Sequence, residues 1–230
     1  MIDKKNLKKV LSRIDSAKKR SGSIKKVEIV AVTKNHPAYS IYSSYNQGIR
    51  HIGENKVQES EKKIKKIKRQ PLLGLTKRFI GHLQSNKVNK CLDIFDTIDS
   101  VHSFKLAKRI SKRAVLIEKT VPVLLEVKTS DEKRKFGFGV EEIDEMLLCT
   151  DLPNIKVEGL MTMAPFTQNQ LKIRKSFSTL RILLEKLNNL KPDIKMNELS
   201  MGMSSDFEIA VEEGSTMVRL GTVLFGKRKT

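Results

Sequence analysis

Short apolar runs alternate with helix-period segments along this chain, and that alternation constrains the fold more than any other feature. Eight of the runs have the length and the apolar, often β-branched character of buried strands. They are Val27–Thr33, Ile49–Gly53, Arg78–Gly81, Ile94–Ile98, Pro122–Val127, Val157–Met163, Glu198–Met201 and Met217–Leu220. Strands that alternate with helices are typical of a parallel sheet, and eight such units in 230 residues predict a single closed (β/α)8 barrel of the α/β class. A doubly wound open sheet would need fewer strands and is the second choice.

The segments between the strands have apolar residues at helical spacing. The helices expected after the first strand are Pro37–Gln47, Val57–Lys68, Ser103–Ala114, Val140–Cys149 and Gln168–Leu190. Another helix precedes the first strand and ends at Ser21-Gly22-Ser23. No stretch rich in proline, glycine and serine divides the chain. We therefore expect one domain over residues 1–230, with residues 1–22 forming an extra helix packed on the barrel.

The chain is strongly basic, with 45 Lys and Arg against 26 Asp and Glu and a formal net charge of +19. Such a charge favours binding to phosphate backbones. However, lysine outnumbers arginine by 33 to 12, and aromatic residues make up only 5% with no tryptophan. Side chains that read base edges or stack on bases are therefore scarce. We expect the charge to lie on solvated helix faces, and we expect no nucleic-acid partner.

The two cysteines, Cys91 and Cys149, are far apart and have no spacing typical of metal ligands. We expect both to be buried thiols, and we expect no metal. The N-terminal segment lacks the apolar core of a signal peptide, and no apolar run is long enough to cross a bilayer. These features predict a cytoplasmic protein with no membrane partner.

Functional residues of such barrels lie at the C-terminal ends of the strands and in the loops that follow. Lys34 comes directly after the first strand. If it points into the barrel mouth, partial desolvation lowers the pKa of its amine, which suits a nucleophile or a Schiff-base lysine. The alternative is a lysine that simply reaches out to water. His82 is the one histidine at a predicted strand end, and Asp99 and Ser100 are expected just after the fourth strand.

A second candidate feature is the loop Ser200–Asp206, of sequence SMGMSSD, which precedes a helix. Ser205 and Glu208 fit a capping box, which needs no ligand. The functional alternative is a phosphate site, because the loops after strands seven and eight commonly bind phosphate in this barrel class. Arg219 and Gly221 belong to the neighbouring loop. A Schiff-base lysine combined with a phosphate site indicates pyridoxal phosphate.

Several longer strings connect these features to a known family. They are AVTK, GENKVQE, FIGHLQSNK, EGLMTM, LSMGMSSDFEIAVEEGSTMVRLGT and LFGKR. In their order and spacing, from Val27 to Arg228, the chain resembles the pyridoxal phosphate homeostasis proteins (the YggS/PROSC group). The resemblance implies a barrel similar to the N-terminal domain of alanine racemase, with pyridoxal 5′-phosphate as cofactor. The chain departs from the family at Thr76-Lys77-Arg78 and at Lys135-Phe136-Gly137, which leaves the outer rim of the pocket open.

The resemblance also assigns roles to individual residues. Lys34 resembles the lysine that forms the Schiff base, Asn55 a residue lining the ring, and Arg219 the arginine facing the pyridine nitrogen. The residues implied on the phosphate side are Ser200, Met201, Gly202, Ser204, Gly221 and Thr222. We place His82 at the pocket rim. An arginine cannot accept a proton, so the pyridine nitrogen facing Arg219 would stay unprotonated and the cofactor would be a weaker electron sink.

These expectations favour a protein that holds and delivers pyridoxal phosphate inside the cell without robust turnover. An amino-acid racemase is the alternative. It needs a second base, but the chain ends soon after the eighth strand, and Tyr39, Tyr42 and Tyr45 all follow the first strand. We expect a monomer, because the second racemase domain that builds the usual dimer interface is missing. Pyridoxal-phosphate-dependent apo-enzymes are the expected recipients.

Overall fold

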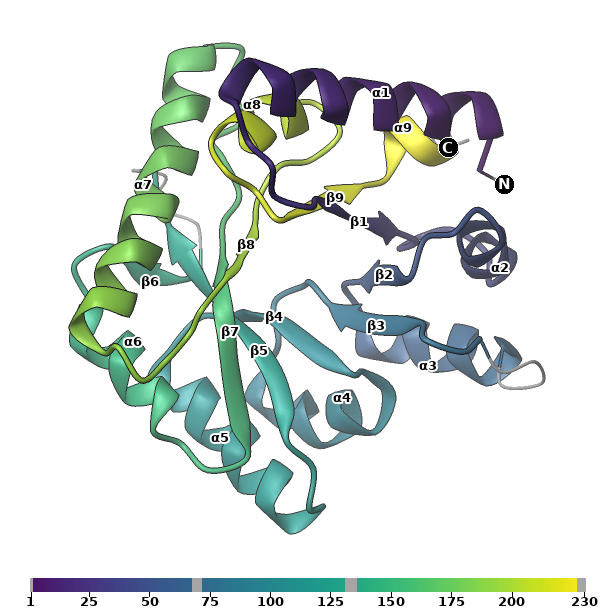
Figure 1. The fold of residues 1–230 in the computed structure, drawn as a ribbon. Helices are drawn as coiled ribbons and strands as arrows, with labels where there is room; N and C mark the ends of the chain where they lie inside the picture. Colours follow the sequence, from purple (N-terminus) through teal and green to yellow (C-terminus); the bar gives the residue numbers. More distant parts are fainter. Residues whose placement is uncertain (1, 68–71, 131–135, 227–230) are drawn as a thin grey trace.

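The computed structural model describes residues 2–67, 72–130 and 136–226, and within them eight parallel strands close into a barrel (Figure 1). Each barrel strand pairs with the next, β4 pairs with β5, and β9 pairs with β1 to complete the ring. The barrel strands are β1 (Glu28–Val32), β2 (His51–Glu54), β3 (Thr76–Phe79), β4 (Thr97–Val101), β5 (Val121–Lys128), β7 (Ile155–Met161), β8 (Glu198–Ser200) and β9 (Met217–Leu220). The predicted barrel is confirmed, and the open sheet is wrong.

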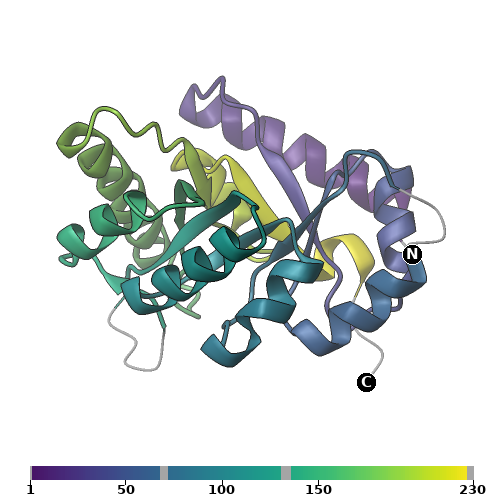
Figure 2. The same ribbon diagram turned by 90° about the horizontal axis from the view of Figure 1, so that it is seen from below.

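Helices surround the strands on the outside of the barrel (Figures 1 and 2). They are α1 (Lys4–Ser21), α2 (Tyr39–Asn46), α3 (Val57–Ile67), α4 (Val88–Ile94), α5 (Phe104–Leu116), α6 (Ile143–Thr150), α7 (Gln170–Leu190), α8 (Phe207–Glu212) and α9 (Thr222–Phe225), with a 3-10 turn η1 (Ser85–Lys87) before α4. The helices expected from periodicity are present, with ends that shift by up to three residues. Helices α4 and α9 escaped prediction because each is shorter than the window in which a helical period can be recognised. In the described ranges, no helix is both long and apolar enough to span a membrane.

The fourth strand was predicted too early in the sequence. Ile94 ends helix α4, and the strand begins only at Thr97. The apolar pair Ile94-Phe95 looked like the start of a strand, but Phe95 packs edge-to-face on Phe79, with ring centroids 5.2 Å apart, in the layer between helices and barrel. Asp99 and Ser100 therefore lie within β4, and the expectation that they follow it is wrong.

A short strand outside the barrel was also missed. Strand β6 (Phe138–Gly139) pairs with the end of β5, through Val127 with Phe138 and Lys128 with Gly139. Helix α6 follows it and begins at Ile143, three residues later than expected. Lys135, the first residue of the family departure at Lys135-Phe136-Gly137, lies outside the described residues. The loop after β5 thus extends the strand pairing beyond the barrel ring.

Helix α1 packs against α8 and α9 beside the strands β9 and β1 (Figure 1). Asp3 accepts a hydrogen bond from the backbone N–H of Lys5 at its start, and Gly22, with φ of 66°, ends it in the left-handed conformation. Its buried residues are Leu7, Val10, Ile14 and Ala17, which form an apolar stripe, whereas Leu11, expected on the same face, is exposed. Its basic face includes Arg13, whose guanidinium lies 2.6 Å from Glu208 of α8.

Strands β7 and β8 approach each other closely at Gly159. A Cβ atom built on this glycine would lie 1.9 Å from the carbonyl oxygen of Glu198, its register partner on β8. The contact is with backbone, so no side-chain rotation can relieve it. Only glycine fits here without separating the two strands.

We predict that Gly159→Ala lowers the free energy of unfolding by about 3 kcal/mol, because it overpacks two paired strands. Gly22→Ala is the matched control. A Cβ atom there meets nothing within 4 Å, and the left-handed backbone costs about 1 kcal/mol. Urea denaturation of both variants measures the difference. Equal losses would contradict the steric explanation.

Candidate functional site

A cavity of about 500 Å³ opens at the C-terminal ends of the barrel strands. It is lined by residues that follow β1, β7, β8 and β9, together with Val32, Ile80 and Arg219. The predicted site residues that line it are Lys34, Ser204, Arg219, Gly221 and Thr222. The structure therefore brings together the first strand end and the last two loops, as the barrel topology predicts.

Lys34 is the second residue after β1, and it is half-buried against the cavity. The backbone around it is fixed by the neighbouring strand and by a turn. The N–H of Thr33 donates to the carbonyl of Gly53 on the next strand at 3.1 Å, and the N–H of His36 donates to the carbonyl of Thr33 at 3.0 Å. Asn35 has a positive φ of 61°. The chain thus turns sharply where the lysine leaves the strand.

Arg219 is on β9, and hydrogen bonds to Ser200 and Thr162 hold its guanidinium in a buried position. Its Nη1 donates to the carbonyl and hydroxyl oxygens of Ser200, at 2.6 and 2.9 Å, and its Nη2 donates to the carbonyl of Thr162 at 2.7 Å. Burial lowers the pKa of Arg219, and the nearby carboxylates of Asp99, Asp206 and Glu126 act in the opposite direction. A guanidinium stays charged in such surroundings and only donates hydrogen bonds.

One of these carboxylates is in a buried ion pair within the barrel wall. Arg78 Nη1 donates to both carboxylate oxygens of Asp99, at 2.9 and 3.1 Å, and Thr97 Oγ1 donates to Asp99 Oδ1 at 2.9 Å. Beside it, the hydroxyl of Ser100 donates to the carbonyl of Gly81 at 2.5 Å. The side chains of Asp99 and Ser100 therefore form hydrogen bonds within the barrel wall, and not in the loops at the mouth of the cavity.

The loop after β8 has a backbone that depends on glycine. Gly202 has a φ of 94°, and a Cβ atom built on it would lie 2.6 Å from the Cβ of Ala210 and 2.9 Å from the Cα of Phe207. Ser200 is bonded to Arg219, and Met201 is fully buried in the hydrophobic core. These three predicted residues, Ser200, Met201 and Gly202, are not among those that line the cavity. Their contacts are with Arg219, with the hydrophobic core and with helix α8.

Ser204 faces the cavity from the same loop and contacts the loop after β9. Its Oγ accepts hydrogen bonds from the backbone N–H groups of Gly221 and Val223, both at 3.3 Å. These N–H groups are at the start of helix α9, where backbone donors have no partner within the helix. A hydroxyl and two N–H groups thus converge at one edge of the cavity.

The capping box expected at Ser205 and Glu208 is wrong. Helix α8 begins after Asp206, which accepts a hydrogen bond from the N–H of Met203 at 2.5 Å and makes no side-chain cap to the helix. Glu208 instead pairs with Arg13 of α1. The Asp206 side chain accepts from a residue three positions before it, so it closes the turn from Met203 to Asp206 and does not cap the first turn of α8.

Asn55 and His82 lie on an adjoining recess of about 130 Å³, not on the cavity that Lys34 lines. The Oδ1 atom of Asn55 is buried and has no hydrogen-bond partner among the described residues. His82 stacks on Phe136, with ring centroids 3.7 Å apart, and on His102, at 4.6 Å. Desolvation lowers the pKa of both histidines, which favours their neutral forms.

Sequence reasoning missed several residues around the mouth. His102 directly follows β4, and the strand signal would have found it if the fourth strand had been placed correctly. Phe166, in the loop after β7, lines the cavity and is fully exposed. Met163, which the sequence predicts at the end of that strand, lines the cavity as well. His36 also lines the cavity and packs on Phe225, with ring centroids 4.7 Å apart. No signal in the sequence distinguished Phe166 and His36 from ordinary surface residues.

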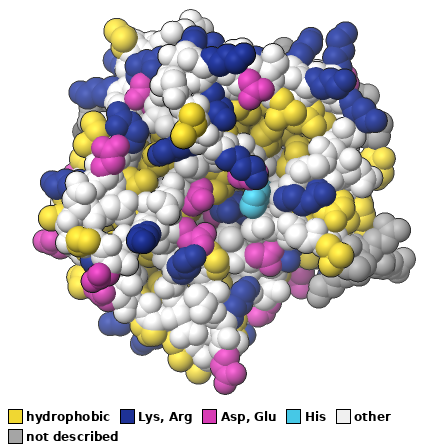
Figure 3. Space-filling model, viewed as in Figure 1, with side chains coloured by type: hydrophobic (Ala, Val, Ile, Leu, Met, Phe, Trp, Pro, Cys, Tyr) yellow, Lys and Arg dark blue, Asp and Glu magenta, His cyan; other side chains and the backbone are white. Residues whose placement is uncertain are grey.

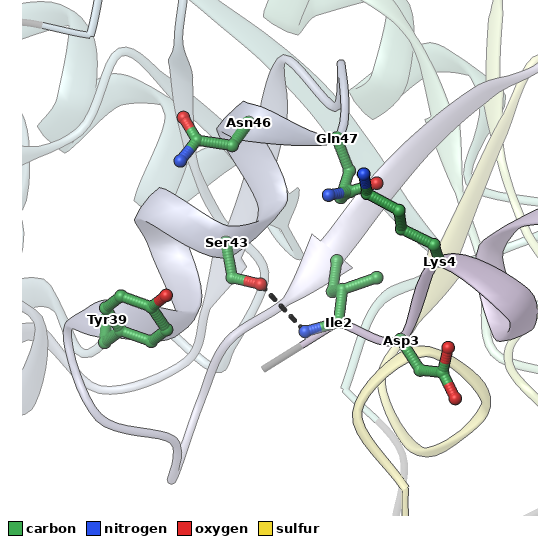
Figure 4. Close-up of a pocket in the computed structure, with 7 residues that line it drawn as sticks. All are labelled: Ile2, Asp3, Lys4, Tyr39, Ser43, Asn46 and Gln47. Atoms are coloured by element: carbon green, nitrogen blue, oxygen red, sulfur yellow. Dashed lines mark hydrogen bonds between the residues drawn. The ribbon is translucent and has the colours of Figure 1, made fainter.

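A second cavity of about 500 Å³ lies outside the barrel, between the start of α1 and helix α2 (Figure 4). Tyr39, Ser43, Asn46 and Gln47 form one wall, and the hydroxyl of Ser43 accepts a hydrogen bond from the N–H of Ile2 at 2.8 Å. No residue predicted for the site lies there. Across the described part of the chain, no group of His, Cys, Asp and Glu could hold a metal ion. The cavity at the strand ends is therefore the candidate site.

Comparisons with known proteins agree with this geometry. The family model described as alanine racemase, N-terminal domain, matches residues 5–229. The pyridoxal phosphate homeostasis protein of Aquifex aeolicus is 40% identical over 225 residues, covering 97% of each chain. That of Vibrio cholerae is 34% identical over 226 residues, covering 97% of this chain and 95% of its own.

Solved structures give the same result. PipY of Synechococcus elongatus, determined with pyridoxal phosphate bound, has a TM-score of 0.83 and 36% identity, covering 94% of this chain and 99% of its own. An alanine racemase of Clostridium difficile has a TM-score of 0.75 and 18% identity, covering 100% of this chain and 57% of its own. The second likeness shows the shared fold alone.

We predict that Arg219→Met lowers the free energy of unfolding by about 3 kcal/mol, because buried acceptors and carboxylates lose their cationic partner. Arg181→Met is the matched control. Arg181 pairs with the exposed Glu185 on α7 and lies 4.0 Å from Glu213, which Arg174 also pairs with, so its loss should change stability by less than about 1 kcal/mol. Urea denaturation measures both variants. If the Arg219 variant were as stable as the control, the guanidinium would not be balancing buried charge.

The two thiols should be unreactive in the folded protein. Cys91 and Cys149 are both free and buried; burial raises the pKa of Cys149 to about 12 and raises the pKa of Cys91 further. Because the thiolate is the nucleophile, we predict no alkylation by iodoacetamide at about pH 8 in the native state, and alkylation of both after unfolding. Mass spectrometry reads the result. Native alkylation at either cysteine would contradict the prediction.

Proposed function

This chain belongs to the alanine racemase N-terminal domain family, with pyridoxal phosphate homeostasis proteins among its relatives, and we propose that it holds pyridoxal 5′-phosphate as a Schiff base on Lys34. It would act in the intracellular homeostasis and delivery of this cofactor without robust catalytic turnover. The observation that carries the proposal is the cavity at the strand ends, in which Lys34 and Arg219 meet the loops after β8 and β9.

The residues of the cavity fit this cofactor chemically. Its volume of about 500 Å³ is in the range of small-molecule sites. It offers one lysine amine for an aldehyde, a buried guanidinium for a ring nitrogen, and hydroxyl and backbone N–H donors for a phosphate. The cofactor would supply an aldehyde, and Lys34 would hold it through a C=N bond, with the aldehyde oxygen released as water.

On the phosphate side, Ser204 and Thr222 would donate from their hydroxyl groups, and Gly221 and Val223 from their backbone N–H groups. The two N–H groups now meet Ser204 Oγ at 3.3 Å, which is long for a hydrogen bond. A phosphate oxygen is a stronger acceptor than a hydroxyl, because it carries negative charge. The start of α9 adds the positive end of backbone dipoles to the same edge.

Arg219 would face the pyridine nitrogen. Because a guanidinium donates and does not accept, this nitrogen would stay unprotonated, and the cofactor would withdraw electrons less strongly from a bound amine. Such a site favours holding the cofactor over carbanion chemistry. The names of the relatives agree, since they refer to homeostasis and not to a reaction.

The racemase alternative has less support. Racemisation by two bases needs a second proton donor on the other face of the substrate. The hydroxyls of Tyr42 and Tyr45 donate to the carbonyls of Ile67 and Leu73, at 3.3 and 3.0 Å, and Tyr39 lines the outer cavity between α1 and α2. None of the three tyrosines lines the cavity that contains Lys34.

Nucleic-acid binding also has little support. On the face seen in Figure 3, Lys and Arg side chains are scattered and have Asp and Glu among them, rather than forming one basic stripe.

We extend the proposal to a cytoplasmic monomer of one domain over residues 1–230, with pyridoxal-phosphate-dependent apo-enzymes as recipients and no nucleic-acid partner. Binding to duplex DNA that survives moderate salt would contradict this part.

The test of the main proposal is chemical trapping. Protein incubated with pyridoxal phosphate and then desalted should absorb visible light, and borohydride should fix the cofactor to Lys34, as read by peptide mass spectrometry. Lys34→Ala should abolish the label. Lys56→Ala is the control, because Lys56 is an exposed lysine in the loop after β2, at the same end of the barrel, and should keep the label.

Two results would count against the proposal. A desalted protein that carries no cofactor, or a label on other lysines only, would remove Lys34 as the attachment site. Loss of chirality from L-alanine in the loaded protein, abolished by Lys34→Ala, would replace the carrier with the racemase alternative.

A further inference from the structure

A buried lysine on helix α3 forms a polar cluster with the loop that carries Lys34. The buried face of α3 consists of Val57, Ser60, Lys63, Ile64 and Ile67, so Lys63 occupies a position where helical periodicity calls for an apolar residue. It is only 8% exposed, whereas the neighbouring Lys62, Lys65 and Lys66 are exposed. A lysine is rarely buried unless its charge is paired.

All three N–H donors of the Lys63 ammonium have an acceptor. Its Nζ donates to the carbonyl oxygen of Thr33 at 2.8 Å and to Glu54 Oε1 at 2.8 Å, and it lies 2.9 Å from Glu59 Oε1. The hydroxyl of Thr33 donates to the same Glu54 oxygen at 2.7 Å. One cation therefore joins Thr33 after β1, Glu54 of β2 and Glu59 of α3 through charge-assisted hydrogen bonds. The other carboxylate oxygen of Glu54, Oε2, is buried and has no hydrogen-bond partner among the described residues.

The same cluster holds the backbone on both sides of Lys34. Before it, the Thr33 carbonyl accepts from Lys63 and from the N–H of His36, at 2.8 and 3.0 Å. After it, the N–H of Asn35 donates to Glu59 Oε1 at 2.9 Å, while Asn35 has a positive φ of 61°. A left-handed residue persists only where its surroundings hold it. The peptide groups that flank Lys34 are thus bonded to one ion-pair cluster.

We propose that Lys63, with Glu59 and Glu54, is a positioning residue for Lys34, fixing the direction in which its amine enters the cofactor cavity. The inference rests on the proposed function of Lys34. Lys63 is not among the residues that line the cavity, and it acts through the backbone of residues 33–36. An amine displaced by about 1 Å from its attack geometry can lose about 100-fold in rate.

Helix α3 itself offers matched variants. Lys63→Met keeps an unbranched side chain and removes the charge. Glu59→Ala removes the acceptor of Asn35 at a side chain that is 29% exposed, so it leaves Glu54, which is 1% exposed, still paired with Lys63. Lys65→Met is the control, because it breaks an equivalent i,i+4 pair, with Glu61, on the exposed face.

The first measurement needs no cofactor. In native-state amide hydrogen exchange, we expect the Asn35 N–H to exchange about 10-fold faster or more in Lys63→Met and Glu59→Ala than in the wild type, and to be unchanged in Lys65→Met. The second is stopped-flow absorbance after mixing with pyridoxal phosphate. The rate constant for covalent attachment, per folded molecule, should fall about 10-fold or more in the first two variants only. The circular dichroism of the bound cofactor, per molecule attached, should fall with it.

The outcomes separate the two proposals. A wild-type protein that gives no reducible product on Lys34 removes the proposed function, and this inference with it. If the wild type reacts but both variants attach the cofactor at the wild-type rate, Lys63 does not position Lys34, even where exchange at Asn35 is faster, and its role is structural. If Lys63→Met does not fold, Glu59→Ala decides the question alone.

Discussion

The pairing of β9 with β1 is the interaction on which the candidate site depends. It joins the two ends of the chain in parallel register, with Val30 opposite Arg219 and Ala31 opposite Leu220. Without this pairing, Lys34 and the loops after β8 and β9 would belong to opposite edges of a sheet. Closure instead makes them neighbours at one rim, and the helices that pack outside, α1 against α8 and α9, reinforce the same junction. The cavity is a consequence of closing the ring.

The part of the site that could be predicted is the part that strand ends determine. Lys34, Ser204, Arg219, Gly221 and Thr222 line one cavity because each lies at or just after a strand, and a barrel collects those positions at one rim. The roles of the remaining predicted residues depend on the paths of the loops. Loop paths follow from local contacts, such as Asp206 with the N–H of Met203, which no periodic pattern encodes. Asn55 directly follows β2 and still lies on a separate recess, so a position at a strand end does not by itself place a residue on the cavity.

The fold could be predicted further than the site, and its errors have physical causes. Strand and helix types followed from hydrophobic period, but α4 ends at Ile94, with only two residues between it and the start of β4 at Thr97, so apolar residues of the helix end were assigned to the strand. Polar residues inside the barrel wall also escaped. Lys63 belongs to a helix whose lysines were expected on a solvated face, and Arg78 to an expected strand. The structure shows both of them buried, with Glu54 and Glu59 compensating the charge of Lys63 and Asp99 that of Arg78.

The hydroxyl of Ser204 completes the hydrogen bonding of the loop after β9. By accepting from Gly221 and Val223, it satisfies two backbone donors at the start of α9 that would otherwise remain unpaired at the wall of an apolar-lined cavity. Under the proposed function, a phosphate would exchange this set of hydrogen bonds for another, and its departure would restore the first set. Such an exchange would need no unfolding at this end of the barrel.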